Sequence, residues 1–124
     1  MNVEITTEKI DAGFLMKLKG DVDMNTSPDV RTNLGEVFKQ GAGAKALLIN
    51  LSQVRYMDSS GIATLVEGLQ LSQRTQTRFG LYGLRSNARS VLELARLTKV
   101  FSIFESEQEA LEKIVKTQPF SGLS

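Results

Sequence analysis

The chain has 124 residues, which is close to the usual size of one domain and enough to bury roughly two thirds of its unfolded surface. Hydrophobic residues make up 41% and charged residues 23%, a composition typical of a globular protein and not of a disordered one. Fifteen Lys and Arg against fourteen Asp and Glu leave a formal net charge of +1, which gives no general attraction to nucleic acid.

The chain contains no Cys and no His. These absences exclude disulfides, thiolate nucleophiles, zinc sites built from Cys or His, and the most common general base. We therefore expect no enzyme, no cofactor and no metal ion. The first residues lack the basic and apolar regions of a signal peptide, and every apolar run is far too short to span a bilayer. We expect the protein to act in the cytoplasm, without membrane insertion.

The first predicted elements are two strands, residues 3–7 and 14–18, which residues 11–13 join as a hairpin. A polar loop follows Gly20. Ser27 is then placed to cap a helix that begins at Pro28 and ends near Gly41. The apolar face of this helix consists of Val30, Leu34, Val37 and Phe38.

Residues 46–51 form a nearly unbroken apolar run, which predicts a central strand covered on both faces. Ser60 and Gly61 open a second helix that ends in the polar residues 72–77, and residues 79–84 follow as a strand. The buried face of this helix consists of Ile62, Leu65, Val66 and Leu69.

Ser86 or Asn87 is expected to cap a third helix, and residues 100–104 to form the last strand. The sequence 106–109 is a capping box that opens a fourth helix. The apolar faces predicted for these two helices are Ala88, Val91, Leu92 and Ala95, and then Ala110, Leu111, Ile114 and Val115. We expect Arg85, Arg89 and Arg96 to form the solvated face of the third helix.

The order of elements is therefore β-β-α-β-α-β-α-β-α, an α/β fold. Right-handed crossovers after a hairpin build a mixed, mostly parallel β-sheet with four or five strands after the N-terminal hairpin, and helices pack on the sheet. Residues 1–117 are expected to form one domain, and residues 118–124 a flexible tail.

The residues most suggestive of function are 56–61, a strand-to-helix turn at the carboxyl end of the predicted sheet. Asp58, Ser59 and Ser60 are all good helix caps, but a helix needs only one, so capping alone does not explain why three stand together. A serine beside unpaired helix N–H groups accepts a phosphate well, and the phosphate would add about 1.5 to 2 negative charges to the surface.

This turn and its flanks resemble the STAS domain of anti-sigma factor antagonists. The matching stretches are residues 19–23, 48–52, 57–62 and 100–104, within a likeness that covers residues 3–115. The resemblance implies that Ser59 is the phosphoacceptor. It implies that the unphosphorylated domain binds an anti-sigma factor serine kinase and so releases a sigma factor, that phosphorylation abolishes this binding, and that a phosphatase restores it.

The predicted partner-binding surface combines the turn, the start of the following helix and the polar loop after Gly20. Met24 is expected there either as an exposed partner contact or as a packing residue. The residues of this surface are Asp23, Met24, Asn25, Thr26, Met57, Asp58, Ser60, Gly61, Ile62 and Thr64.

Three other functions are weighed against this one. An enzyme with Ser59 as nucleophile lacks a base and a G-x-S-x-G turn, and a receiver domain phosphorylated on Asp58 would not begin with a hairpin. The remaining alternative is a STAS accessory subunit of a lipid or anion transporter, a cytoplasmic interaction module without a switch whose partners are transporter subunits. Ala63 and residues 93–97 lack glycines that family members often carry, which leaves the branch open.

Overall fold

The computed structural model describes residues 2–41 and 43–116 of the chain. The strands in this part are β1 (Glu4–Ile10), β2 (Gly13–Lys19), β3 (Ala46–Gln53), β4 (Arg78–Tyr82) and β5 (Ser102–Phe104). The helices are α1 (Ser27–Gln40), α2 (Ser59–Thr75), α3 (Ser86–Leu94) and α4 (Glu107–Lys113), which continues into the 3-10 turn η1 (Ile114–Lys116). The predicted order of elements is confirmed.

The strands form one sheet in the order β1-β2-β3-β4-β5. β1 and β2 are antiparallel, and every later pair is parallel, so the predicted mixed, mostly parallel sheet is confirmed. The described residues hold five strands in all, so three strands follow the hairpin and not the four or five predicted after it. β3 is the middle strand, as its apolar run predicts.

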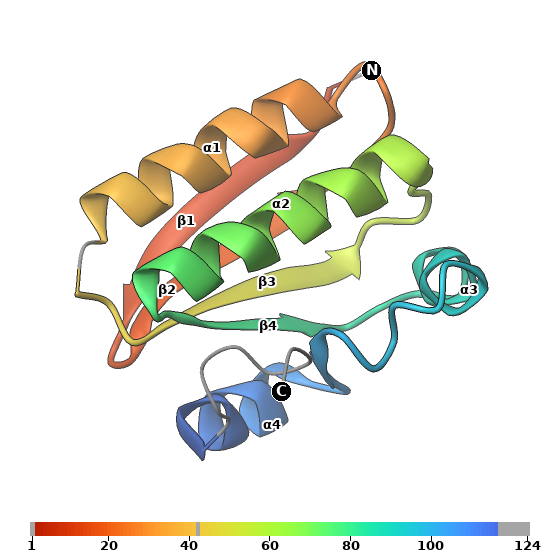
Figure 1. Cartoon of the computed structure of the whole chain (residues 1–124). Helices are drawn as coiled ribbons and strands as arrows, with labels where there is room; N and C mark the ends of the chain where they lie inside the picture. Colours follow the sequence, from red (N-terminus) through yellow and green to blue (C-terminus); the bar gives the residue numbers. More distant parts are fainter. Residues whose placement is uncertain (1, 42, 117–124) are drawn as a thin grey trace.

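Helices cover both faces of the sheet (Figure 1), with α1 and α2 side by side on one face. Side chains alternate along β3, so Leu47, Ile49 and Leu51 join the larger core cluster, which includes residues of α1, α2 and α3. Ala46 and Leu48 point to the other face and pack with Ala110 of α4 and Ile114 of η1. All of these β3 side chains are at most 1% exposed.

The structure corrects several predicted boundaries. α1 starts at Ser27 after Thr26, which makes no side-chain capping bond, and α2 starts one residue early, at Ser59. β5 begins only at Ser102, so residues 100 and 101 precede the strand although Phe101 is buried. The capping box of α4 is half confirmed: Ser106 Oγ accepts from Glu109 N at 3.1 Å, but the Glu109 side chain bonds the Glu105 N–H instead of the Ser106 N–H.

Three predicted core residues are exposed instead. Ala95 is the residue at which α3 ends, so it no longer follows the helical face. In the short α4–η1 segment the buried stripe is Ala110 and Ile114, and Leu111 and Val115 lie one residue further round and are 39% and 46% exposed. The predicted tail lies outside the described residues. Across residues 2–41 and 43–116, no helix is long and apolar enough to cross a membrane.

Candidate functional site

The turn between β3 and α2 lies against the loop that follows β2. Val22 and Met57 pair as an isolated parallel bridge. Val22 N donates to Tyr56 O at 3.0 Å, and Asp58 N donates to Val22 O at 3.2 Å. The structure thus brings together the two segments that were expected to share one surface.

Of the three possible caps, Asp58, Ser59 and Ser60, it is Asp58 that caps α2. Its Oδ1 accepts from Ser60 N at 2.9 Å, from Gly61 N at 3.3 Å and from Ser60 Oγ at 2.5 Å. The Ser60 hydroxyl is therefore already hydrogen-bonded to the Asp58 carboxylate. Ser59 is the first residue of α2 and is exposed, and no group among the described residues hydrogen-bonds its hydroxyl.

The Asp58 carboxyl is held in its charged form. The hydrogen bond from the Ser60 hydroxyl lowers its pKa most, partial burial opposes this, and the backbone N–H groups of Gly61, Ser60 and Met24 lower it further. The residue that precedes Ser59 in the chain therefore carries a carboxylate charge at neutral pH.

Gly61 is required by close packing. A Cβ added there would lie 2.5 Å from Met57 Cγ and 2.8 Å from the backbone oxygen of Val22. Because a side chain would push α2 away from the loop, only glycine lets the first turn of α2 approach Val22 this closely.

Asn87 is a site residue that the sequence does not reveal. Its Oδ1 accepts from the N–H of the buried Met57 at 2.7 Å, across 30 residues of sequence. Either Ser86 or Asn87 was predicted to cap α3, but Arg85 occupies the cap position and makes no side-chain capping bond. No local pattern distinguishes a capping Asn from one that bonds a distant backbone group.

The loop after Gly20 is closed by Asp23 and Thr26. Asp23 Oδ1 accepts from Asn25 N at 2.9 Å and from Thr26 N at 3.1 Å. The Thr26 hydroxyl donates to Asp21 O at 2.8 Å and accepts from Asp23 N at 3.0 Å. This bonding leaves Met24 at the tip, 75% exposed.

Burial divides the predicted contact residues into three groups. Met24, Asn25 and Ser59 are exposed, whereas Asp23, Asp58 and Ser60 are half-buried. The remaining predicted contacts are buried, so they hold the turn in shape and present almost no surface to a partner; they are Thr26, Met57, Gly61, Ile62 and Thr64. Tyr56, 46% exposed beside the turn, was not predicted as a contact.

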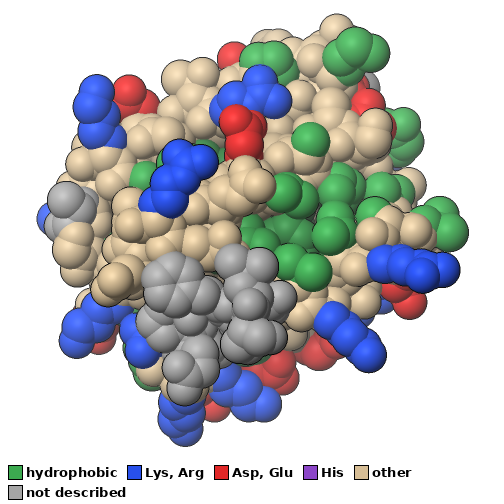
Figure 2. Space-filling model, viewed as in Figure 1, with side chains coloured by type: hydrophobic (Ala, Val, Ile, Leu, Met, Phe, Trp, Pro, Cys, Tyr) green, Lys and Arg blue, Asp and Glu red, His purple; other side chains and the backbone are tan. Residues whose placement is uncertain are grey.

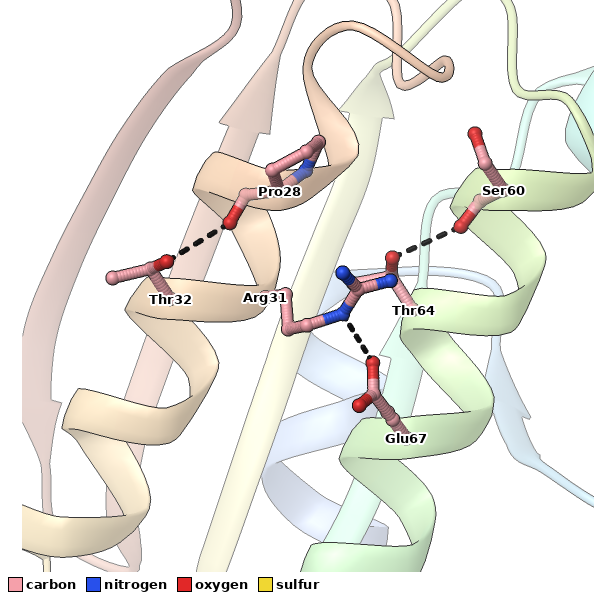
Figure 3. Close-up of polar contacts among 6 residues, drawn as sticks. All are labelled: Pro28, Arg31, Thr32, Ser60, Thr64 and Glu67. Carbon is pink, nitrogen blue, oxygen red and sulfur yellow. Dashed lines mark hydrogen bonds and ion pairs between the residues drawn. The ribbon is translucent and has the colours of Figure 1, made fainter.

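Thr64 shows how the start of α2 satisfies its own polar groups (Figure 3). Its fully buried hydroxyl donates to Ser60 O at 2.9 Å. One turn further along, Glu67 of α2 pairs with Arg31 of α1 at 2.5 Å, an ion pair whose side chains are both about half exposed. Because both side chains are about half exposed, this ion pair between the two helices adds little stability.

Comparison with known proteins identifies similar chains. The STAS domain family pattern matches residues 4–110. An anti-sigma-B factor antagonist of Listeria monocytogenes is 29% identical over 110 residues, covering 88% of this chain and 95% of that protein. An anti-sigma F factor antagonist of Paenibacillus polymyxa is 24% identical over 114 residues, covering 92% and 97%.

Solved structures share the fold. An anti-sigma factor antagonist from Mycobacterium paratuberculosis superposes with a TM-score of 0.81 at 24% identity, covering 90% of this chain and 93% of that one. SpoIIAA in its unphosphorylated form gives 0.69 at 18% identity, covering 90% and 97%. Its phosphorylated form gives 0.68 at 19% identity, covering 90% and 99%.

Proposed function

Because the chain belongs to the STAS domain family, we propose that it is an anti-sigma factor antagonist whose partner binding is switched off by phosphorylation of Ser59. The relatives named above are antagonists, which is a binding role and not a catalytic one. The observation that carries the proposal is the exposed, unbonded Ser59 hydroxyl at the start of α2, beside a cap already completed by Asp58.

In this scheme the unphosphorylated protein acts in the cytoplasm and binds an anti-sigma factor that is also a serine kinase. Binding releases a sigma factor. The kinase then transfers the terminal phosphoryl group of ATP to Ser59 Oγ, with loss of the hydroxyl proton, and the modified protein dissociates. A phosphatase hydrolyses the phosphate and restores the binding form.

The site explains why phosphate would change binding without unfolding the domain. Phosphorylation adds about 1.5 to 2 negative charges at a helix N-terminus, where the helix dipole favours them. Asp58, the preceding residue, is already charged, so two successive residues of the turn would together carry nearly three negative charges. The net charge of the chain, +1, also changes sign.

The proposed contact surface centres on the exposed residues of the site, Met24, Asn25 and Ser59. Apolar side chains also gather on the side of α2 that faces α3 (Figure 2). Half-buried hydrophobic residues of these helices include Val66 and Val91. Apolar area next to a polar turn is typical of protein interfaces, and it supports a protein partner.

Intact mass after incubation with the cognate kinase and ATP tests the proposal. We expect wild-type protein to gain one phosphoryl group and Ser59→Ala to gain none. Ser60→Ala is the matched control, since Ser60 is the neighbouring hydroxyl but is bonded to Asp58; it should still be phosphorylated. An unmodified wild type, or a modified Ser59→Ala, would overturn the assignment.

A further inference from the structure

β1 forms one edge of the sheet and is open to solvent on both of its faces. It pairs with β2 along one side, and no other described segment pairs with its outer side. Ile5 and Ile10 are half-buried, whereas Glu4 and residues 6–9 are exposed. An edge strand whose backbone groups are free is a ready template for pairing with another chain.

The register of the hairpin shows which backbone groups of β1 are free. Only two residues separate Ile10 from Gly13, so these two form the hydrogen-bonded pair next to the turn. Bonded and non-bonded pairs alternate along an antiparallel ladder, and therefore every second residue of β1 bonds β2. The residues between are Ile5, Thr7 and Lys9, and their N–H and C=O groups point away from β2.

These three outward residues are arranged symmetrically about Thr7. A second copy of β1 can lie antiparallel to the first across a twofold axis at Thr7. Ile5 of each copy then stands opposite Lys9 of the other, and the two Thr7 residues stand opposite each other. Each of these pairs can exchange two backbone hydrogen bonds, and Thr–Thr pairs are favourable across strands.

The charges of β1 select this register over its neighbours. With the axis at Thr7, Glu4 faces Ile10 of the other copy and Glu8 faces Thr6. An axis at Thr6 would instead bring Glu4 opposite Glu8, and an axis at Glu8 would bring the two Glu8 carboxylates together. Like charges that stand directly opposite each other destabilise a pair of strands. Charge complementarity therefore favours the axis at Thr7.

We propose that β1 binds β1 of a second copy of this chain, so that two sheets join into one across a twofold axis at Thr7. The occupant is a second copy because both the outward backbone groups and the charges of β1 complement β1 itself. Ser59 follows β3, two strands away from this edge, so the pairing leaves the turn of Ser59 accessible. The proposal does not depend on the function of Ser59.

Sedimentation velocity of the full chain over a range of concentrations tests the proposal. We expect a reversible equilibrium between monomer and dimer. Thr6→Glu places a carboxylate opposite Glu8 of the other copy at both symmetry-related positions, and it should weaken the dimer about tenfold. Because Lys17 lies opposite Thr6 within the hairpin, this variant should not destabilise the monomer. Gln70→Glu, at an exposed position of α2, is the control and should leave the equilibrium unchanged. A monomer at every concentration, or equal effects of the two variants, would overturn the proposal.

A cysteine cross-link checks the register. The chain has no Cys of its own, so a disulfide from one introduced cysteine can only join two copies. Opposite Cα atoms of a bonded antiparallel pair are about 5.5 Å apart, within disulfide range, so mild oxidation of Thr7→Cys should give a covalent dimer. Thr6→Cys is the matched control: it faces Glu8 of the other copy, so it should stay monomeric. No cross-link from Thr7→Cys, or an equally efficient one from Thr6→Cys, would refute this pairing.

Discussion

The two strand-to-helix turns after β3 and β4 lie side by side and differ in how the N-terminus of the following helix is capped. At the first, Asp58 satisfies the helix N-terminus and leaves Ser59 free. At the second, Arg85 stands in the cap position without a capping bond, and Asn87 bonds Met57 of the first turn. The β4–α3 turn thus forgoes a local cap and holds its neighbour in place. The first turn presents the exposed Ser59 hydroxyl, and the second presents the exposed Arg85 side chain.

The largest expected effect is on affinity for the partner, and it should distinguish a charge placed at Ser59, the first residue of α2, from one placed at Ser86, the first residue of α3. Ser59→Asp should weaken binding to the anti-sigma partner about 100-fold, or ~2.7 kcal/mol, because a charge is added at the contact surface. Ser59→Ala should bind like wild type. Ser86→Asp places the same charge at the first residue of α3 and should change affinity little. Equal affinities of the two Ser59 variants, measured by calorimetry, would contradict the switch.

The second prediction tests how closely the first turn is packed. Gly61→Ala should destabilise the protein by about 2–3 kcal/mol, because the new methyl group would overlap Met57 and the Val22 carbonyl. Gly35 of α1 has no atom within 4 Å of an added Cβ, so Gly35→Ala should stabilise by about 0.5–1 kcal/mol. Urea unfolding measures both. Similar effects at the two positions would refute the packing argument.

The third prediction concerns the hydrogen bond between Met57 and Asn87, which links the two turns. Asn87→Ala leaves the buried Met57 N–H without its acceptor and should cost about 1–3 kcal/mol of unfolding free energy. Asn87→Asp keeps an acceptor oxygen and should restore most of the loss. A temperature-melt series that shows no difference between Asn87→Ala and Asn87→Asp would mean that the bond does not support the turn.

The smallest effect concerns the two caps. Asp58→Ala should cost about 1 kcal/mol at pH 7, whereas Ser86→Ala should cost less than about 0.5 kcal/mol, since Ser86 caps nothing. Asp58 has a lowered pKa, so its charged form stabilises the fold above the unfolded-state pKa of about 3.9 and that contribution disappears as the pH falls through the lower folded value. The difference between wild type and Asp58→Ala should therefore shrink as the pH falls below the unfolded-state pKa. A difference that grows in acid would contradict the sign of the shift.

The sequence predicted the first turn better than the second. The apolar run of β3, the amphipathic pattern of α2 and the residues 58–61 are local signals, and they located the turn correctly. They did not identify the cap, because Asp58, Ser59 and Ser60 are equally suitable by type. Asp58 becomes the cap because the close approach of Gly61 to Val22 sets the path of the backbone at this turn.

Long-range contacts account for what could not be predicted. Asn87 looks like a cap in its local sequence, and only the folded chain brings it to Met57. Arg85 is exposed as expected, but it precedes α3 and lines a hollow together with Lys19 and Arg55, which only the folded chain reveals. Leu111 and Val115 follow a helical pattern, but α4 is too short to bury more than one stripe.

The order of strands in the sheet has a consequence for folding. Every strand pairs with its neighbours in sequence, so a chain emerging from the ribosome can extend the sheet one strand at a time. The Met57 N–H, however, bonds Asn87, which comes 30 residues later in the chain. The turn that carries Ser59 is therefore fully anchored only after the β4–α3 connection has been synthesised. Until then the turn of a nascent chain lacks the hydrogen bond that holds Met57.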